Sequence, residues 1–252
     1  MAGARDVDLA ETRVDQIWVY ARIGVNWDAL GSEALGDGDA RNLTGPLLEA
    51  LADTPAILVN GARQTGKSTL VQSPEVAGQD RQYLTFDDPG ILAAGRRDPN
   101  GFVAGLNAPV TLDEIQHVPE IFSVIKAAID RNRQPGRFLL TGSANVTLLP
   151  KLSESLAGRM EVLTLWPFSQ GEILGAKENF VDALFSRKSM GWSGNSPAMS
   201  WEELLECIVD GGYPPAVARK SAARRDAWFQ YYVTTVLQRD IRDLANIGSF
   251  ML

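Results

Sequence analysis

The sequence has few of the residues that form disulfides and histidine metal sites, with one cysteine and one histidine among its 252 residues. A single cysteine excludes a disulfide within the chain, and a cytoplasmic location is the expectation that follows. Cys207 falls in an apolar helical pattern with Leu204 and Ile208, so we expect a small buried hydrophobic residue there rather than a nucleophile. His117 follows two carboxylates and is expected in a loop, not as a metal ligand.

Long apolar runs and a strong overall charge are also missing. No stretch of about eighteen apolar residues exists, so we expect no membrane span, and the N-terminal residues lack the apolar centre of a secretory signal. The net charge is −7, of which residues 1–40 contribute −5, and this balance gives no support for nucleic-acid binding. Residues 219–242 carry a local excess of +4, which indicates either a solvated helix face or a contact for nucleic acid.

Apolar strand patterns alternate with helical patterns after Pro46, which predicts a parallel sheet covered by helices on both faces. After Pro167 the pattern becomes helical only. Strands are expected over 56–60, 82–86, 109–112, 137–140 and 160–165, and helices over 67–72, 118–131, 148–156, 201–209 and 222–246.

The first 45 residues are predicted to be an extension rather than part of the sheet domain. Their apolar residues from Val14 to Val25 have helical spacing, and residues 31–45 have the Gly-, Asp- and Ala-rich composition of a linker. We therefore expect an extension over 1–45, a sheet domain over 46–170 and a helical lobe over 171–252.

A glycine-rich segment follows the first predicted strand directly. From Gly61 to Ser68 it has the pattern G-x-x-x-x-G-K-S, which is typical of the phosphate-binding loop of P-loop nucleotidases. The two glycines permit a tight turn whose amide groups face an anion, while Lys67 reaches the β- and γ-phosphates and Ser68 offers its hydroxyl to Mg²⁺. A glycine-rich turn with a surface lysine is the alternative. The residues expected to bind nucleotide are Gly61, Ala62, Arg63, Gln64, Thr65, Gly66, Lys67, Ser68 and Thr69.

The third predicted strand ends in two carboxylates, Asp113 and Glu114. A P-loop site needs an acid at a strand tip to hold Mg²⁺ through water, and Asp113 fits this place. Glu114 is one residue further, where it is placed to polarise a water for in-line attack on the γ-phosphate. The alternative for such an Asp-Glu pair is the N-cap of a helix.

Three other polar residues are candidates with open alternatives. If the fourth strand lies between the first and third, Ser143 at its end touches the γ-phosphate or the attacking water; otherwise it caps a helix. Arg159, before the fifth strand, is either an arginine finger, in cis or from a neighbouring subunit, or a partner in a surface ion pair. Arg63 contacts phosphate or braces Asp87 or Asp88.

A set of short motifs occurs in one order along the chain: Gly61-Ala-Arg-Gln-Thr-Gly-Lys-Ser-Thr69, Leu112-Asp-Glu-Ile-Gln116, Leu140-Thr-Gly-Ser143, Leu156-Ala-Gly-Arg159, Leu165-x-Pro-Phe-Ser169, Gly211-Gly-Tyr-Pro214 and Arg239-Asp-Ile-x-Asp-Leu244. Over residues 46–252 this set resembles the prokaryotic AAA-like P-loop ATPases that carry a C-terminal domain of unknown function. The resemblance implies an α/β P-loop NTPase fold with sheet order 5-1-4-3-2, ATP as ligand and a helical lobe after the fifth strand. It also implies Asp113 as the Mg²⁺ acid, Glu114 as the base and Ser143 as the sensor.

Members of that family usually begin near the helix before the first strand and continue well past Leu244. The resemblance therefore predicts that residues 1–45 are an unusual addition and that a C-terminal part is missing from this chain.

The expected function is Mg²⁺-dependent ATP binding and hydrolysis that moves the helical lobe. The residues expected to act in catalysis are Lys67, Glu114, Ser143 and Arg159. The first alternative is an ATP-gated module that hydrolyses negligibly and recruits DNA or a protein through its lobe. A P-loop kinase for a small metabolite is another, but the sequence has no arginine-rich lid segment. An arginine finger from a neighbour would require a homo-oligomer.

Overall fold

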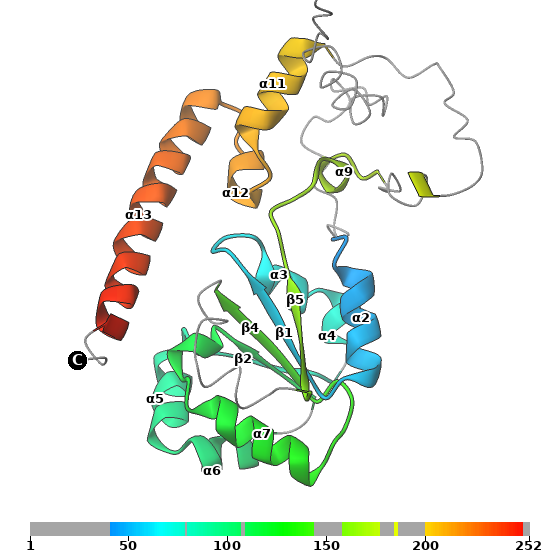
Figure 1. The fold of residues 1–252 in the computed structure, drawn as a ribbon, viewed down its shortest axis with the longest axis vertical. Coiled ribbons are helices and arrows are strands. Elements are labelled where there is room, and N and C mark those ends of the chain that lie inside the picture. Colours follow the sequence, from blue (N-terminus) through cyan, green and yellow to red (C-terminus); the bar gives the residue numbers. More distant parts are fainter. Residues whose placement is uncertain are drawn as a thin grey trace, which may run out of the picture.

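The computed structural model describes residues 41–78, 80–106, 109–143, 158–176, 184–185 and 200–248 (Figure 1). The predicted helices at 14–25 and 148–156 lie outside these residues. Five parallel strands form one sheet in the order β2-β3-β4-β1-β5, which confirms the expected order 5-1-4-3-2. Their bounds are β1 Ala56–Gly61, β2 Gln82–Thr85, β3 Val110–Asp113, β4 Phe138–Ser143 and β5 Met160–Thr164.

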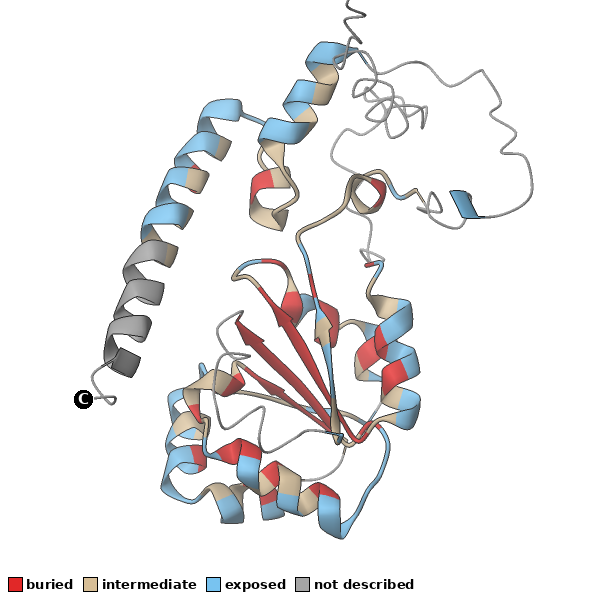
Figure 2. Ribbon diagram, viewed as in Figure 1, coloured by how far each residue is buried: buried red, intermediate tan, exposed pale blue. Residues whose placement is uncertain are grey.

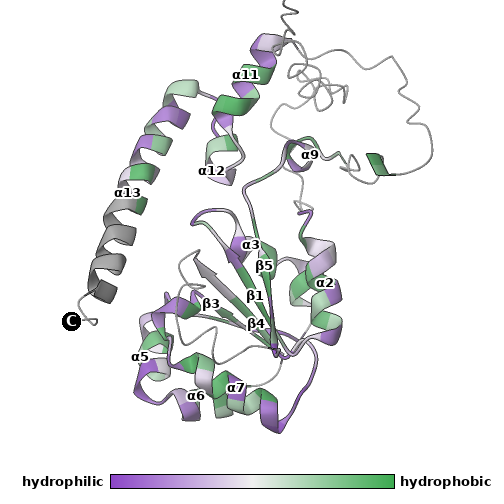
Figure 3. Ribbon diagram, viewed as in Figure 1, coloured by the Kyte–Doolittle hydropathy of each residue, from purple (hydrophilic) through white to green (hydrophobic). Residues whose placement is uncertain are grey.

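Side chains of β1 alternate between two hydrophobic cores, because successive residues of a strand face opposite sides of the sheet. Ala56 and Leu58 pack with α5, α6 and α7, whereas Ile57 and Val59 pack with α2, α3 and α4. Figure 2 shows that the central strands are buried along their length, and Figure 3 shows their apolar character. The helices of these two layers are α2 Thr44–Asp53, α3 Lys67–Val71, α4 Pro74–Ala77, α5 Pro89–Arg97, α6 Pro99–Ala104 and α7 Ile121–Arg131.

The predicted linker over 31–45 is wrong at its C-terminal end. Thr44 and Gly45 already belong to α2, and Arg41 is buried against the loop that follows β1. Composition suggested a linker there, but the hydrogen bonds that Arg41 makes with distant backbone place this stretch in the folded core.

Local signals account for several helix ends. Asp88 accepts hydrogen bonds from the amides of Gly90 and Ile91, and Pro89 occupies the first helical position, so this Asp-Pro pair sets the start of α5. The predicted helix over 118–131 begins later, at Ile121, after the short 3₁₀ turn η2 Ile115–His117. The six-residue α6 was not predicted, because so short a helix shows no clear period.

Where the structure describes the C-terminal region, the regular elements after β5 are helices, as predicted. Its elements are α9 Gln170–Ile173, α11 Trp201–Asp210, α12 Pro214–Val217 and α13 Ala222–Gly248. Ser169 with Glu172, and Ser200 with Glu203, form capping boxes at α9 and α11. None of the described helices combines the length and apolar composition that a membrane span requires.

The expectation that Cys207 is a buried residue is wrong. It is only half-buried, and no residue of α11 is fully buried. Desolvation still raises the pKa of its thiol, and the neighbouring carboxylates act in the same direction. A raised pKa disfavours the thiolate, in agreement with the expectation that Cys207 is not a nucleophile.

Candidate nucleotide-binding site

The predicted phosphate loop connects β1 to α3 at the carboxyl edge of the sheet. A side chain at Gly61 would bring its Cβ within 2.4 Å of the Leu165 carbonyl oxygen, so only glycine fits there. Gly66 has a φ of 93° and Gln64 a φ of 62°, which is the left-handed backbone that a tight loop of this kind requires.

Lys67 points back into the loop. Its Nζ donates to the carbonyl oxygens of Gly61 at 3.2 Å and Ala62 at 2.9 Å. Burial lowers the pKa of this lysine, and the nearby carboxylates of Glu114 and Asp113 act in the opposite direction without reversing the shift. An anion bound inside the loop would stabilise the charged lysine.

The carboxylate of Asp113 accepts hydrogen bonds from three hydroxyl groups. Ser68 Oγ lies 3.2 and 3.1 Å from its two oxygens, and the Tyr83 hydroxyl donates at 2.7 Å. Thr141 Oγ1 donates to Oδ1. Desolvation and the bond to Asp113 raise the pKa of Tyr83, so its hydroxyl remains a donor at neutral pH.

This cluster fits the chemistry of magnesium. Mg²⁺ prefers oxygen ligands and is usually held by one or two protein groups together with phosphates. Ser68 and Asp113 supply such oxygens beside the loop. In the described part of the chain, no group of three or more His, Cys, Asp or Glu side chains is arranged to hold a metal by itself. A magnesium ion here would take its remaining ligands from phosphate oxygens and water.

Glu114 adopts an unusual backbone conformation for a residue with a side chain. Its φ is 56° and its ψ is 47°, in the left-handed region, where such a residue costs about 1–3 kcal/mol. Its amide donates to Thr141 Oγ1 at 3.1 Å, so the threonine that supports Asp113 also fixes the turn that follows it. The Glu114 carboxylate accepts a hydrogen bond from Gln116 Nε2.

A pocket of about 210 Å³ separates the loop from α13. Arg63 and Gln64 line one wall and Glu114 another, whereas α13 supplies the rest. The α13 residues are Tyr231, Tyr232, Thr235 and Val236. The Tyr232 hydroxyl also donates to the Arg63 carbonyl oxygen at 3.2 Å. The expected base therefore faces a space between the loop and the C-terminal region.

The structure places Ser143 at the end of a strand beside the loop strand, and Arg63 lines the pocket beside the loop. β4 lies between β1 and β3, and Ser143 at its end is buried opposite Gly61. Among the described contacts, no ion pair or hydrogen bond joins Arg63 to Asp87 or Asp88. Asp87 instead lies 3.5 Å from His117 Nε2, and Asp88 caps α5.

Arg159 is not brought to the loop of its own chain. It precedes β5, whose first residue pairs with Ala56, so it lies at the opposite end of the sheet, roughly 15 Å along the strands from the loop. Its Nε donates to Asp130 Oδ1 at 2.5 Å, and this bond holds the pKa of Asp130 below its usual value. The surface ion pair, one of the two alternatives for Arg159, is therefore present with Asp130. A role of Arg159 as an arginine finger for a neighbouring subunit stays a prediction.

Tyr83, Thr141 and Arg41 belong to the site but were not predicted. Thr141 lies in the same Thr-Gly-Ser segment as Ser143, and that segment was a signal for it. Tyr83 is a single aromatic residue in an edge strand, and nothing local marks it.

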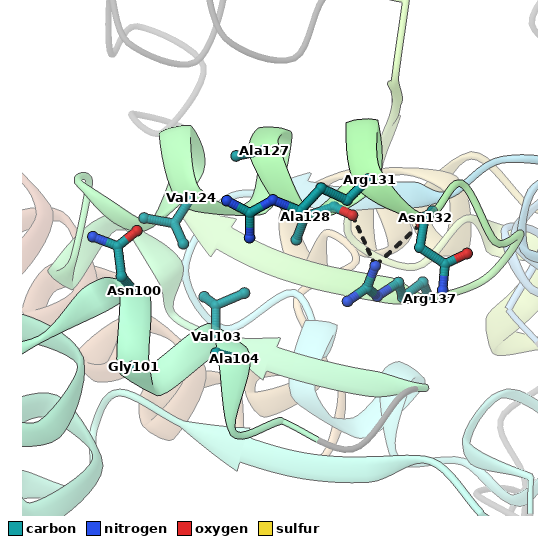
Figure 4. A pocket seen from close by; sticks show the side chains of 10 residues that line it. All are labelled: Asn100, Gly101, Val103, Ala104, Val124, Ala127, Ala128, Arg131, Asn132 and Arg137. Carbon is teal, nitrogen blue, oxygen red and sulfur yellow. Dashed lines mark hydrogen bonds between the residues drawn. The ribbon is translucent and has the colours of Figure 1, made fainter.

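A larger pocket, of about 410 Å³, lies between α6 and α7 and contains none of the predicted site residues. Figure 4 shows Arg137 at one end of it, where Nη1 donates to the carbonyl oxygens of Ala128 and Asn132 at 2.9 and 3.1 Å. That guanidinium is held by backbone, and Arg131 is the other charged residue that lines the pocket.

Comparisons with known proteins agree with this geometry. Residues 53–174 match the model of an AAA domain, and residues 202–250 match a domain of unknown function, DUF8612. The uncharacterized proteins Rv2008c of Mycobacterium tuberculosis and Mb2031c of Mycobacterium bovis are each 32% identical over 207 residues, which is 82% of this chain and 40% of theirs. The chain thus spans well under half the length of these relatives.

A solved structure gives the same fold. The Walker-type ATPase PABY2304 of Pyrococcus abyssi superposes with a TM-score of 0.50 at 14% identity, covering 84% of this chain and 77% of that one. The P-loop, the sheet order and the matches agree on one fold: the chain has the P-loop NTPase fold, with a region similar to an AAA domain followed by a region similar to a domain of unknown function.

Proposed function

We propose that this protein binds ATP with Mg²⁺ at the loop Gly61–Thr69 and hydrolyses it, and that the nucleotide state is transmitted to the C-terminal helices. One observation carries the proposal: Lys67 and Ser68 of the loop lie together with Asp113, which is hydrogen bonded to Ser68, and Glu114, which lines a pocket with Arg63 and Gln64. Each provides a different part of phosphoryl-transfer chemistry.

Binding rests on the loop and its lysine. The amides of the turn and the Lys67 ammonium would hold the β- and γ-phosphates by charge-assisted hydrogen bonds. Ser68 and Asp113 would hold magnesium together with those phosphates, and the ion would neutralise part of their charge.

Hydrolysis would use Glu114 as the general base. Arg63, Gln64 and Glu114 line one pocket, so a water bound there would lie within reach of this carboxylate. Its oxygen would attack the γ-phosphorus as the bond to the β–γ bridging oxygen breaks, and Glu114 would accept the proton. ADP and phosphate are the products. Ser143, buried beside the loop strand, would orient the water or the γ-phosphate.

Coupling to the C-terminal region would pass through α13. This helix forms one wall of the pocket, and Tyr232 is hydrogen bonded to the loop backbone at Arg63. Filling the pocket would therefore alter contacts that α13 makes.

The alternative is an ATP-gated module with negligible turnover, which recruits DNA or a protein. The hydrogen bond from Gln116 to the Glu114 carboxylate favours it, because a base engaged in this way is less free to accept a proton. Hydrolysis in the absence of any partner separates the two functions.

The test is phosphate release from ATP by the purified chain, with and without Mg²⁺, alongside a nucleotide titration. DNA is added in one arm and small hydroxyl acceptors in another. Lys67→Ala is the control, and we expect it to lose most ATP affinity, because each charge-assisted contact is worth about 1.5–3 kcal/mol. ATP affinity equal to wild type in Lys67→Ala would place nucleotide elsewhere.

A further inference from the structure

Arg41 lies just before α2, directly behind the phosphate loop. Its side chain is 5% exposed, and all three guanidinium nitrogens donate hydrogen bonds. Nη1 donates to the Thr65 carbonyl at 2.8 Å, Nη2 to the Trp166 carbonyl at 2.6 Å and Nε to Glu172 Oε1 at 3.1 Å. The guanidinium carbon lies 4.4 Å from the centre of the Phe168 ring. Three segments of the chain therefore meet at this one cation.

The contact with Thr65 has a direct effect on the loop. In a planar trans peptide, the carbonyl of one residue and the amide N–H of the next point in opposite directions. Because the Thr65 carbonyl points at Arg41, the Gly66 N–H is directed away from Arg41. Gly66 has a left-handed backbone, and glycine adopts left- and right-handed conformations with similar ease. The peptide between Thr65 and Gly66 would therefore flip readily if nothing held its carbonyl group.

The Arg41 charge is compensated independently of any ligand. Glu172 is 7% exposed on its side chain and forms the ion pair, while the Phe168 ring lies against the guanidinium face. Glu172 also accepts from the amides of Asn42 at 2.6 Å and Ser169 at 2.8 Å, as part of the α9 capping box. These two bonds would partly compensate the carboxylate if Arg41 were replaced, so α9 keeps its cap.

We infer that Arg41 is a positioning residue for the phosphate loop: it holds the Thr65 peptide in the orientation that presents the Gly66 amide to bound phosphate. The inference rests on the proposed nucleotide binding at Gly61–Thr69. Arg41 touches no ligand itself. It lowers the cost of binding, because the loop is already in its binding orientation before the anion arrives.

The experiment compares three variants of this chain with wild type. Arg41→Met keeps length and removes all three hydrogen bonds, and Arg41→Lys keeps the charge but cannot reach three acceptors at once. Glu172→Gln is the matched control, since it breaks the ion pair and leaves the Arg41–Thr65 bond in place. ATP affinity is measured by titration on protein shown to be folded by circular dichroism, and stability by urea denaturation.

We expect ATP affinity to fall at least about tenfold in Arg41→Met, less in Arg41→Lys, and by less than about twofold in Glu172→Gln. If Arg41→Met does not fold, the ranking of Arg41→Lys below Glu172→Gln decides the matter. A purely structural role for Arg41 predicts that stability falls in all variants while ATP affinity of the folded protein is unchanged, and that result would overturn the inference. If wild type itself binds no ATP, the proposed function fails instead.

Discussion

The hydroxyl of Tyr232 lies 3.2 Å from the carbonyl oxygen of Arg63, although 169 positions separate these residues in the sequence. The Tyr232 ring stacks on Trp228 with centroids 5.1 Å apart, and its hydroxyl also lies 3.4 Å from that of Tyr213. Tyr232 therefore links an aromatic cluster of the C-terminal region, formed with Trp228 and Tyr213, to the phosphate loop by a hydrogen bond.

Tyr232→Phe should weaken ATP binding by about two- to tenfold, because it removes one neutral hydrogen bond and keeps the ring packing. The Arg63 carbonyl would no longer be held, so the following Gln64 amide would be less well oriented toward phosphate. Titration with ATP measures the effect. Thr234→Val is the matched control, since it also removes a hydroxyl from α13, and Thr234 is exposed and does not line the pocket. Equal affinities in the two variants would show that the Tyr232 contact is incidental.

Glu114→Gln should separate ATP binding from turnover. The amide keeps the size of the side chain but cannot accept a proton, and loss of a general base typically lowers the rate about 10²–10⁴-fold. ATP affinity should stay near that of wild type, and phosphate release should fall. Gln116→Met provides the companion measurement, because it removes the hydrogen bond that engages the carboxylate. Its hydrolysis should equal or exceed wild type. Normal turnover in Glu114→Gln would move the base to another residue.

Thr141→Val should raise the Mg²⁺ concentration needed for half-maximal ATP binding or hydrolysis. The substitution keeps the shape of a fully buried side chain but removes a donor to Asp113 and the acceptor of the Glu114 amide. The free energy of unfolding should fall by about 1–3 kcal/mol, the usual cost of leaving buried polar groups unsatisfied. Magnesium titration and urea denaturation measure the two effects.

The control for that variant lies on the neighbouring strand. Thr111 is also fully buried, but its hydroxyl has no hydrogen-bond partner in the described part of the chain. Thr111→Val should be neutral or stabilising and leave the Mg²⁺ dependence unchanged. A similar loss in both variants would mean that Thr141 contributes only packing.

Arg159→Ala and Asp130→Ala should differ if Arg159 acts on a neighbouring subunit. Both variants break the ion pair, but only Arg159→Ala removes the arginine. An arginine finger contributes about 10³–10⁵-fold, so hydrolysis should collapse in Arg159→Ala alone. Mixing it with Lys67→Ala protein should then restore hydrolysis, because one partner supplies the loop and the other the arginine. If both variants hydrolyse ATP like wild type, Arg159 is only an ion-pair partner.

Much of the site could be predicted from the sequence because its chemistry is local. The Gly61–Ser68 pattern and the acids that end β3 are contiguous segments whose spacing is set by backbone geometry. The sheet order came from the family resemblance, and the structure confirms it.

The supporting residues could not be predicted, because their partners are distant in sequence. Arg41 lies in a stretch with linker composition, yet it contacts Thr65, Trp166 and Glu172, up to 131 positions away. The helical period located α13 but could not show that Tyr232 faces the loop. The roles of Arg41 and Tyr232 become visible only in the folded structure, where their hydrogen-bond acceptors lie next to them.

The left-handed backbone at Glu114 has a consequence for attempts to stabilise the protein. Glycine adopts this conformation without strain, so a screen that selects only for thermal stability would favour glycine at position 114. The more stable variant would lack the Glu114 carboxylate that lines the pocket. At this position, thermal stability favours glycine, whereas the proposed hydrolysis requires glutamate.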